Sequence, residues 1–280
     1  MSLVDVAMVG HLGPEALAAT GMGGMLAWGA LSIVLGIRTS VQTITARRLG
    51  QKKPKECINA LNNGFLLASI YSIPISLLGW TYGYLIIPLF ITDPITTPIA
   101  ISYFSIASIG IFFNALSFVF QGFYTGIEKT KVHLSVTITS NIINAYLNAG
   151  LIYGKDKLAS LFGAQTNNVL DLSSFWFWAD FEGLGVTGAA IGTLLSSFWM
   201  MGHYAYYLNK QQIIKDNNGF LNLGLNREML KKQIRLSLPM GFQEMMIAVG
   251  YSFFYKIMSL IGILELATTQ LLFTIMHASF

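Results

Sequence analysis

Long apolar stretches constrain this chain more than any other feature of its sequence. A helix needs about 20 mostly apolar residues to cross a bilayer. Only 11% of the residues are charged, against about 25% in soluble domains, which fits neither a soluble enzyme nor a disordered chain. The sequence therefore predicts an all-α polytopic membrane protein. Its long apolar stretches lie at about residues 16–46, 57–91, 97–125, 132–153, 185–208 and 233–261.

Two shorter apolar pieces lie at the ends of the chain, at about 2–10 and 264–280. At about 1.5 Å per residue, neither could cross a bilayer core of about 30 Å. We therefore expect the chain to begin inside a first helix and to stop inside an eighth.

The basic residues fall mainly on one side of the predicted spans. Placing the loops alternately puts 13 of the 17 Lys and Arg in or beside 47–56, 126–131 and 209–232. The opposite loops carry only Lys155 and Lys157. Because cytoplasmic loops are enriched in Lys and Arg, we expect the basic loops in the cytoplasm and the protein in the cell (inner) membrane. This distribution also argues against nucleic acid as the partner.

The remaining two basic residues, Arg38 and Lys256, lie inside predicted spans. Both could extend their charged ends toward the nearer membrane surface. The outer loop 154–184 contains an aromatic run from Phe175 to Trp178, which is typical of a segment resting on the membrane interface. A substrate lid is the alternative for that loop.

A short internal repeat suggests two related halves. Residues 13–20 (GPEALAAT) and 262–269 (GILELATT) share four identities at an offset of 249. Six predicted spans separate the copies, so both would have the same orientation, as in a parallel repeat. We expect a six-helix N-terminal lobe at 1–210, a cytoplasmic linker at 211–232 and the start of a second lobe at 233–280.

Ionisable groups inside a membrane are costly and suggest function. Asp5 would lie in the outer half of the first helix, at a depth comparable to Asn144, Asn148 and Thr193 on two other helices. Their oxygens are ligands that a hard cation prefers, although the carboxylate could instead hold a proton. Alternatively, the asparagines could simply bond helix to helix.

Other polar residues within the spans are weaker candidates. Asn114 and Gln121 share a face of one helix, Asn141 shares a face with Asn144, and Glu244 follows Pro239. A substrate cavity and interhelical hydrogen bonding are both open for them.

Motifs of common enzyme classes are absent from the sequence. It contains no P-loop, no HExxH and no GxSxG. The single cysteine, Cys57, excludes an internal disulfide and a Cys-based metal site. We therefore expect no enzyme activity and no cofactor beyond a coupling ion.

Several segments resemble motifs of the multidrug and toxic compound extrusion (MATE) family. They occur in family order and are spread over about residues 4–270. The matching segments are Val4–Gly13, Val41–Gln42 with Ala46–Gly50, Gln121–Gly122 with Gly126 and Thr130, Asn141–Asn144 with Asn148, and Gly185–Thr193.

The resemblance implies twelve helices in two lobes and cation-coupled efflux of organic, cationic or drug-like small molecules by a monomer in the lipid bilayer. It would place the coupling ion at Asp5, Asn144, Asn148 and Thr193, near the Ala189 carbonyl. The family often has Asp where this chain has Asn148, so H⁺ and Na⁺ both stay open. A lipid-linked precursor flippase and a non-transporting membrane scaffold are the alternatives.

Overall fold

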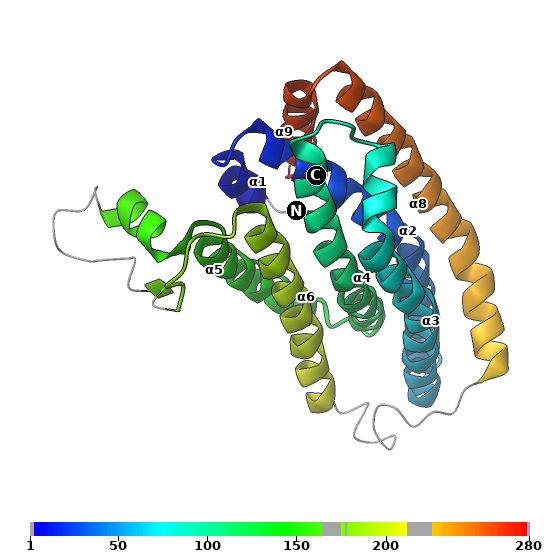
Figure 1. The fold of residues 1–280 in the computed structure, drawn as a ribbon. Helices are drawn as coiled ribbons and strands as arrows, with labels where there is room; N and C mark the ends of the chain where they lie inside the picture. The colour runs from blue at the N-terminus through cyan, green and yellow to red at the C-terminus, as the bar shows by residue number, and fades with distance from the viewer. Residues whose placement is uncertain (1–2, 164–174, 177, 212–225, 279–280) are drawn as a thin grey trace.

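The computed structural model describes residues 3–163, 175–176, 178–211 and 226–278, and its long elements are helices (Figure 1). They form one bundle in which neighbours in sequence mostly run in opposite directions. The elements are α1 (Leu3–Gly10), α2 (Pro14–Gly50), α3 (Pro54–Ile86), η1 (Ile87–Leu89), α4 (Thr96–Gly126), α5 (Thr130–Gly163), α6 (Gly185–Lys210), α8 (Arg227–Ile261) and α9 (Ile263–Ala278).

Four of the described helices are both long enough and apolar enough to cross a membrane: α2, α3 with η1, α4 and α8. α5 and α6 are also long, at 34 and 26 residues, although neither is among these four. The six predicted stretches therefore correspond to six long helices, and α5 and α6 pack against each other.

Two boundaries differ from the sequence prediction. α8 begins at Arg227, ahead of the expected residue 233, because the Asn226 side chain caps it by accepting hydrogen bonds from the N–H groups of Glu228 and Met229. α5 resumes beyond the expected loop start, after a break at Gly154, where φ is 70°. Residues 212–225 of the predicted linker and 164–174 of the predicted loop lie outside the described part.

α2 is the centre of the bundle and packs against α3, α4 and α8. Two glycines allow these helices to approach at backbone distance. A side chain at Gly36 would meet the Ser237 carbonyl and Gly241 of α8, and one at Gly122 of α4 would meet the Arg38 carbonyl. Such small residues drive close helix packing in membranes.

The second lobe begins in the direction that the repeat predicts. Asp5 and Met8 of α1 pair with successively later residues of α5, Asn148 and Tyr153, so these helices run the same way. α5 and α8 both begin near the end of α2, because Gly126, just before α5, lies against Thr45 and Met229 of α8 packs with Ile44. α8 therefore runs in the same direction as α5 and α1. On α9, Gln270 packs against Gly21 of α2, its equivalent at the repeat offset of 249.

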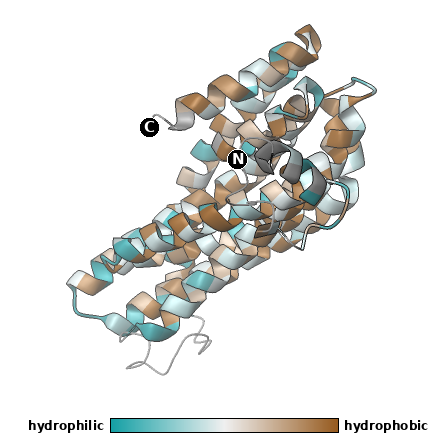
Figure 2. Cartoon of the chain, turned by 90° about the vertical axis from the view of Figure 1, so that its left-hand side faces the viewer, coloured by the Kyte–Doolittle hydropathy of each residue, from teal (hydrophilic) through white to brown (hydrophobic). Residues whose placement is uncertain are grey.

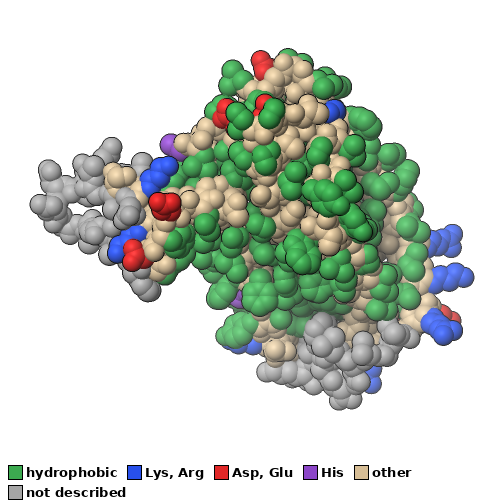
Figure 3. All heavy atoms as spheres, in the orientation of Figure 1, with side chains coloured by type: hydrophobic (Ala, Val, Ile, Leu, Met, Phe, Trp, Pro, Cys, Tyr) green, Lys and Arg blue, Asp and Glu red, His purple; other side chains and the backbone are tan. Residues whose placement is uncertain are grey.

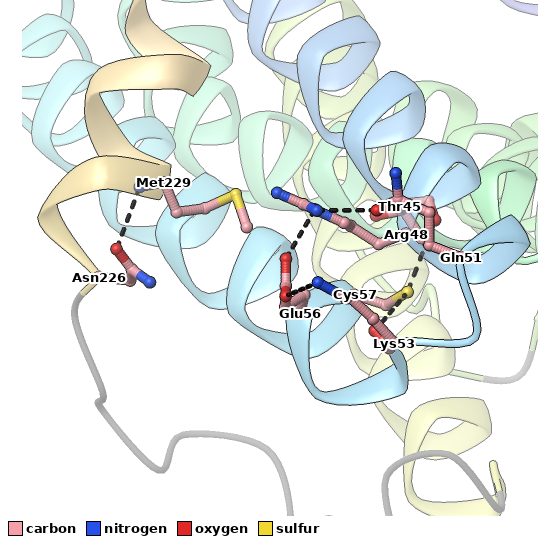
Figure 4. A network of polar contacts seen from close by, with 8 residues as sticks. All are labelled: Thr45, Arg48, Gln51, Lys53, Glu56, Cys57, Asn226 and Met229. Atoms are coloured by element: carbon pink, nitrogen blue, oxygen red, sulfur yellow. Dashed lines mark hydrogen bonds and ion pairs between the residues drawn. The ribbon is translucent and has the colours of Figure 1, made fainter.

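Polar contacts fix the turns at both ends of the bundle. At the basic end, Glu56 pairs with Arg48 at 2.6 Å and with Lys53 at 3.4 Å, beside the start of α8 (Figure 4). At the opposite end, where α4 begins, the Asp93 carboxylate accepts hydrogen bonds from the backbone N–H groups of Ile95 and Thr96. Hydrogen bonds from Thr96, and then Ile95, hold the pKa of Asp93 below its ordinary value.

The surface of the bundle fits a lipid environment. Hydrophobic residues run along the helices, and hydrophilic ones concentrate near one end (Figure 2). A broad hydrophobic band covers the face seen in Figure 3. Large exposed apolar side chains are frequent on α3 and α8, including Trp80, Leu85, Phe253 and Leu260. An apolar surface of this extent indicates contact with membrane or with further protein.

Candidate functional site

The site starts from a buried contact between α1 and α5. The Asn148 amide Nδ2 donates a hydrogen bond to Asp5 Oδ1 at 2.7 Å. Asp5 is 3% exposed and Asn148 is fully buried. One turn further out, the Tyr153 hydroxyl donates to the Met8 carbonyl at 2.6 Å. Two hydrogen bonds thus fix the short α1 against the outer half of α5.

The contact continues to α6 through a second amide. Asn148 Nδ2 also lies 3.4 Å from Asn144 Oδ1, and Asn144 Nδ2 donates to Ser196 Oγ at 3.3 Å. Three helices therefore contribute to one buried polar cluster. The structure brings together Asp5, Asn144 and Asn148 as their expected depths suggested.

Glycines on α6 make room for this cluster. A side chain on Gly192 would overlap Asn148 Oδ1, and one on Gly188 would overlap the Leu151 carbonyl. Gly188 and Gly192 form a small-xxx-small pair that lets α5 and α6 pack at backbone distance. Ala189, which is also fully buried, lies between them.

Two oxygen atoms at the site are buried and unused. Asn148 Oδ1 and Thr193 Oγ1 are out of contact with solvent and have no hydrogen-bond partner. Buried polar atoms normally have partners, so these oxygens are candidates to bind a ligand. Oxygen atoms of these kinds, with the Asp5 carboxylate, are donors that a hard cation prefers. Asn148 bonds Asp5 directly, and Thr193 follows Gly192, which lies against Asn148. No group of three His, Cys, Asp or Glu within the described ranges could hold a metal ion.

The weaker candidates lie elsewhere. Asn114 is half-buried and donates to Ser197 Oγ and the Gly110 carbonyl, both at 3.0 Å. Gln121 contacts His133 near the basic end. Asn141 is exposed, and Glu244 is half-buried on α8. The structure does not bring these four residues into the Asp5 cluster.

One group of residues was not anticipated from the sequence. His133 lies between Gln121 and Tyr204, and Arg38 lies within electrostatic range of both His133 and Tyr204. The guanidinium of Arg38 therefore adds positive charge near these side chains. The signal for His133 was its helical spacing from Asn144 and Asn148 on α5.

The aromatic segment of the outer loop packs on α5 in the part that is described. Trp176 Nε1 donates to the Tyr146 carbonyl at 2.8 Å, and Trp178 Nε1 donates to the Tyr146 hydroxyl at 2.7 Å. Both rings also contact Gly150. These indoles therefore cover α5 around Tyr146 and Gly150.

The fold and the buried carboxylate–amide cluster define a helical, multi-pass membrane protein with an intramembrane polar site, the class to which secondary transporters belong. The profile of the MatE family matches residues 1–149. The chain belongs to this family, whose members are membrane transporters and not enzymes.

Curated relatives and solved structures agree with this assignment. A probable multidrug resistance protein NorM of Bacillus subtilis (strain 168) is 25% identical over 249 residues, which cover 86% of this chain and 49% of that protein. A probable multidrug resistance protein NorM of Geobacillus kaustophilus is 29% identical over 166 residues, which cover 59% of this chain and 36% of that protein. The chain spans about half the length of the curated relatives that match most of it.

Two solved structures show the same fold. An inward-facing multidrug resistance MATE family transporter superposes with a TM-score of 0.74 at 23% identity, covering 96% of this chain and 55% of that one. A MOP superfamily transporter from Pyrococcus furiosus superposes with a TM-score of 0.66 at 21% sequence identity. The match covers 90% of this chain and 50% of that one. The six-helix N-terminal lobe with the start of a second lobe is thus confirmed.

Proposed function

We propose that this chain belongs to a cation-coupled antiporter that exports organic, cationic or drug-like small molecules. Residues 1–210 form its N-terminal lobe, 211–232 a cytoplasmic linker and 233–280 the start of the second lobe. The basic turns between α2 and α3 and at the start of α8 face the cytoplasm, because they carry most of the Lys and Arg residues. The relatives described as probable multidrug resistance proteins support efflux of drug-like molecules.

One observation carries the proposal: the buried Asp5 carboxylate is held by an amide that has a second, unused oxygen. Asn148 can present either end of its amide to Asp5. In the structure Nδ2 donates to the carboxylate. If the amide turned over, Oδ1 would join the carboxylate in binding a cation, with Thr193 Oγ1 and the Ala189 carbonyl as further ligands.

This exchange couples ion binding to the position of α1. A cation entering from outside replaces the Asn148 hydrogen bond and changes how α1 sits on α5 and α6. Substrate binding favours the cation-free arrangement, so each ligand lowers the affinity for the other, and by linkage the effect is reciprocal. Either H⁺ or Na⁺ could serve, because a single carboxylate can be neutralised by a proton or bind a monovalent cation.

Transport assays on Asp5→Asn in the full-length protein test this proposal. In everted vesicles, we expect the wild-type protein to accumulate ethidium when a H⁺ or Na⁺ gradient is applied. Asp5→Asn should abolish that response and still fold, since it removes a buried charge and keeps the shape. Glu228→Gln, an exposed carboxylate in the first turn of α8 and outside the cluster, is the matched control and should keep gradient-driven transport.

Gradient-driven efflux at the wild-type rate by Asp5→Asn would refute this coupling site. Accumulation by the wild-type protein without any gradient would refute antiport itself.

A further inference from the structure

A stripe of polar residues runs along one side of α5, from the Asp5 contact toward the basic end. Its spacings of four, three, four and four residues keep the members on one face of the helix. Over 15 residues the stripe extends about 22 Å. Its members are His133, Thr137, Ser140, Asn144 and Asn148.

His133 is the titratable residue at the inner end of this stripe. Its Nδ1 lies 2.5 Å from the Tyr204 hydroxyl and 3.4 Å from Thr137 Oγ1, and its Nε2 lies 2.6 Å from Gln121 Nε2. The imidazole is nearly parallel to the Tyr204 ring, at 9°. No described Asp or Glu side chain pairs with it. Titratable groups around it are Arg38 of α2, Tyr124 of α4, and His203, Tyr204 and Tyr207 of α6.

These partners can satisfy the imidazole in two protonation states. With its hydrogen on Nδ1, the neutral ring donates to the Tyr204 hydroxyl, and Nε2 accepts from the Gln121 amide. With its hydrogen on Nε2, the ring donates to Gln121 Oε1 once that amide turns over, and Nδ1 accepts from the Tyr204 hydroxyl. A proton added at Nδ1 of this second form makes both ring nitrogens donors. Arg38 nearby repels the added charge, so the proton would be held briefly and released readily.

A buried hydroxyl lies along the stripe between His133 and the Asp5 cluster. Ser140 is 8% exposed, and its Oγ is buried without a hydrogen-bond partner. Such an atom is a natural partner for water. Thr137, which contacts His133, supplies a second hydroxyl on the same face.

We propose that His133 is a proton-binding residue of the transporter, placed on the cytoplasmic side of Asp5 to receive the coupling proton. In this step the Asp5 carboxyl loses its proton to water hydrogen-bonded along the stripe, and His133, in the tautomer with its hydrogen on Nε2, gains one at Nδ1, the nitrogen beside Thr137. The imidazolium then gives its proton to cytoplasmic water. This inference rests on the proposed antiport and adds that the coupling ion is H⁺.

The test uses the full-length protein in proteoliposomes, with ethidium as the probe. We expect His133→Gln to lower ethidium transport driven by a pH gradient by about tenfold or more and to flatten its dependence on internal pH. Exchange of internal for external ethidium at equal pH moves no net proton, so it should stay near the wild-type rate. That exchange also shows whether the variant is folded.

Two further variants sharpen the test. His203→Gln is the matched control, because His203 lies at the same end of the bundle but bonds Thr139, outside the stripe; it should keep the wild-type pH dependence. Tyr204→Phe removes only the hydroxyl that bonds His133, and it should also flatten the pH dependence, though less than His133→Gln does.

An unchanged pH dependence in His133→Gln would overturn this inference and leave the antiport intact. Wild-type transport driven by Na⁺ and insensitive to a pH gradient would do the same. Wild-type transport driven by neither gradient would instead overturn the proposed function.

Discussion

Asn148 is the residue on which the proposed site depends. It is fully buried, bonds the Asp5 carboxylate, and lies against Gly192 of the neighbouring helix. An amide is suited to this position because its two ends can serve a carboxylate in turn as donor and as co-ligand for a cation. A hydrophobic side chain of the same size would pack there but would leave the carboxylate without this donor.

Gly192→Ala tests the position of Asn148 without changing any polar group. The added methyl would overlap Asn148 Oδ1, so the amide must move away from Asp5. We expect gradient-driven transport to fall by about tenfold or more, the effect of losing one hydrogen bond to a charged group. Gly202→Ala is the control on the same helix, since nothing lies within 4 Å of a side chain there. Equal transport by the two variants would argue against a requirement for close packing at Asn148.

The candidate site could be predicted in part from depth and composition. The grouping of Asp5, Asn144 and Asn148 was predictable, because the rise per residue of a helix gives the depth of each side chain. Polar residues are also few in these apolar spans, so those at equal depth stand out. Asn141 shares a face with Asn144 by spacing, yet it is exposed. Spacing gives the angle around a helix but not which neighbours flank it, and α6 covers only one side of α5. For the same reason, the sequence did not predict the contact between His133 of α5 and Tyr204 of α6.

At the scale of helices, α2 and α8 form the main contact between the two lobes. Their closest approach is at Gly36, where both backbones meet, and Gln233 adds a hydrogen bond to the Ala60 carbonyl of α3 at 2.7 Å. Near the basic end, Met229 packs with Ile44 and Ala60. These contacts hold the start of α8 on the N-terminal lobe.

Gly36→Ala should weaken that contact. The methyl group would meet the Ser237 carbonyl oxygen and lie 2.9 Å from Gly241 Cα, and overpacking of this kind costs about 1–3 kcal/mol. We expect a lower thermal unfolding midpoint in detergent. Gly29→Ala is the control in the same interface, because its methyl would lie 3.7 Å from Ala248 Cβ, an ordinary contact. If both variants unfold at the same temperature, α8 is not packed on α2 as described.

The helices themselves were predictable because apolar length is a strong signal and the turns between them are polar. The start of α8 was not, since the Arg227–Lys232 turn of helix is basic and only the cap by Asn226 marks where it begins. The continuation of α5 beyond Gly154 was also missed, because a glycine with positive φ predicts an end and the helix resumes after it.

For the whole molecule, the two lobes are related by a parallel repeat whose equivalent positions meet at Gly21 and Gln270. The proposed coupling site lies on α1, α5 and α6, away from the α2–α8 contact. The account therefore requires that ion binding at Asp5 reach the substrate by moving helices of that lobe. A precursor flippase would need a strongly basic cavity, and the described spans contain only Arg38 and Lys256 as basic residues well inside them.

Cation release on substrate binding tests this central claim most directly. Ethidium would be added to the purified full-length protein in weakly buffered detergent, and released H⁺ would be followed with an indicator dye and displaced ²²Na⁺ by scintillation counting. The account predicts that ethidium releases one of these ions from the wild-type protein and neither from Asp5→Asn, while both proteins still bind the dye. Ethidium binding that releases no cation from the wild-type protein, with an affinity independent of pH and Na⁺, would contradict it.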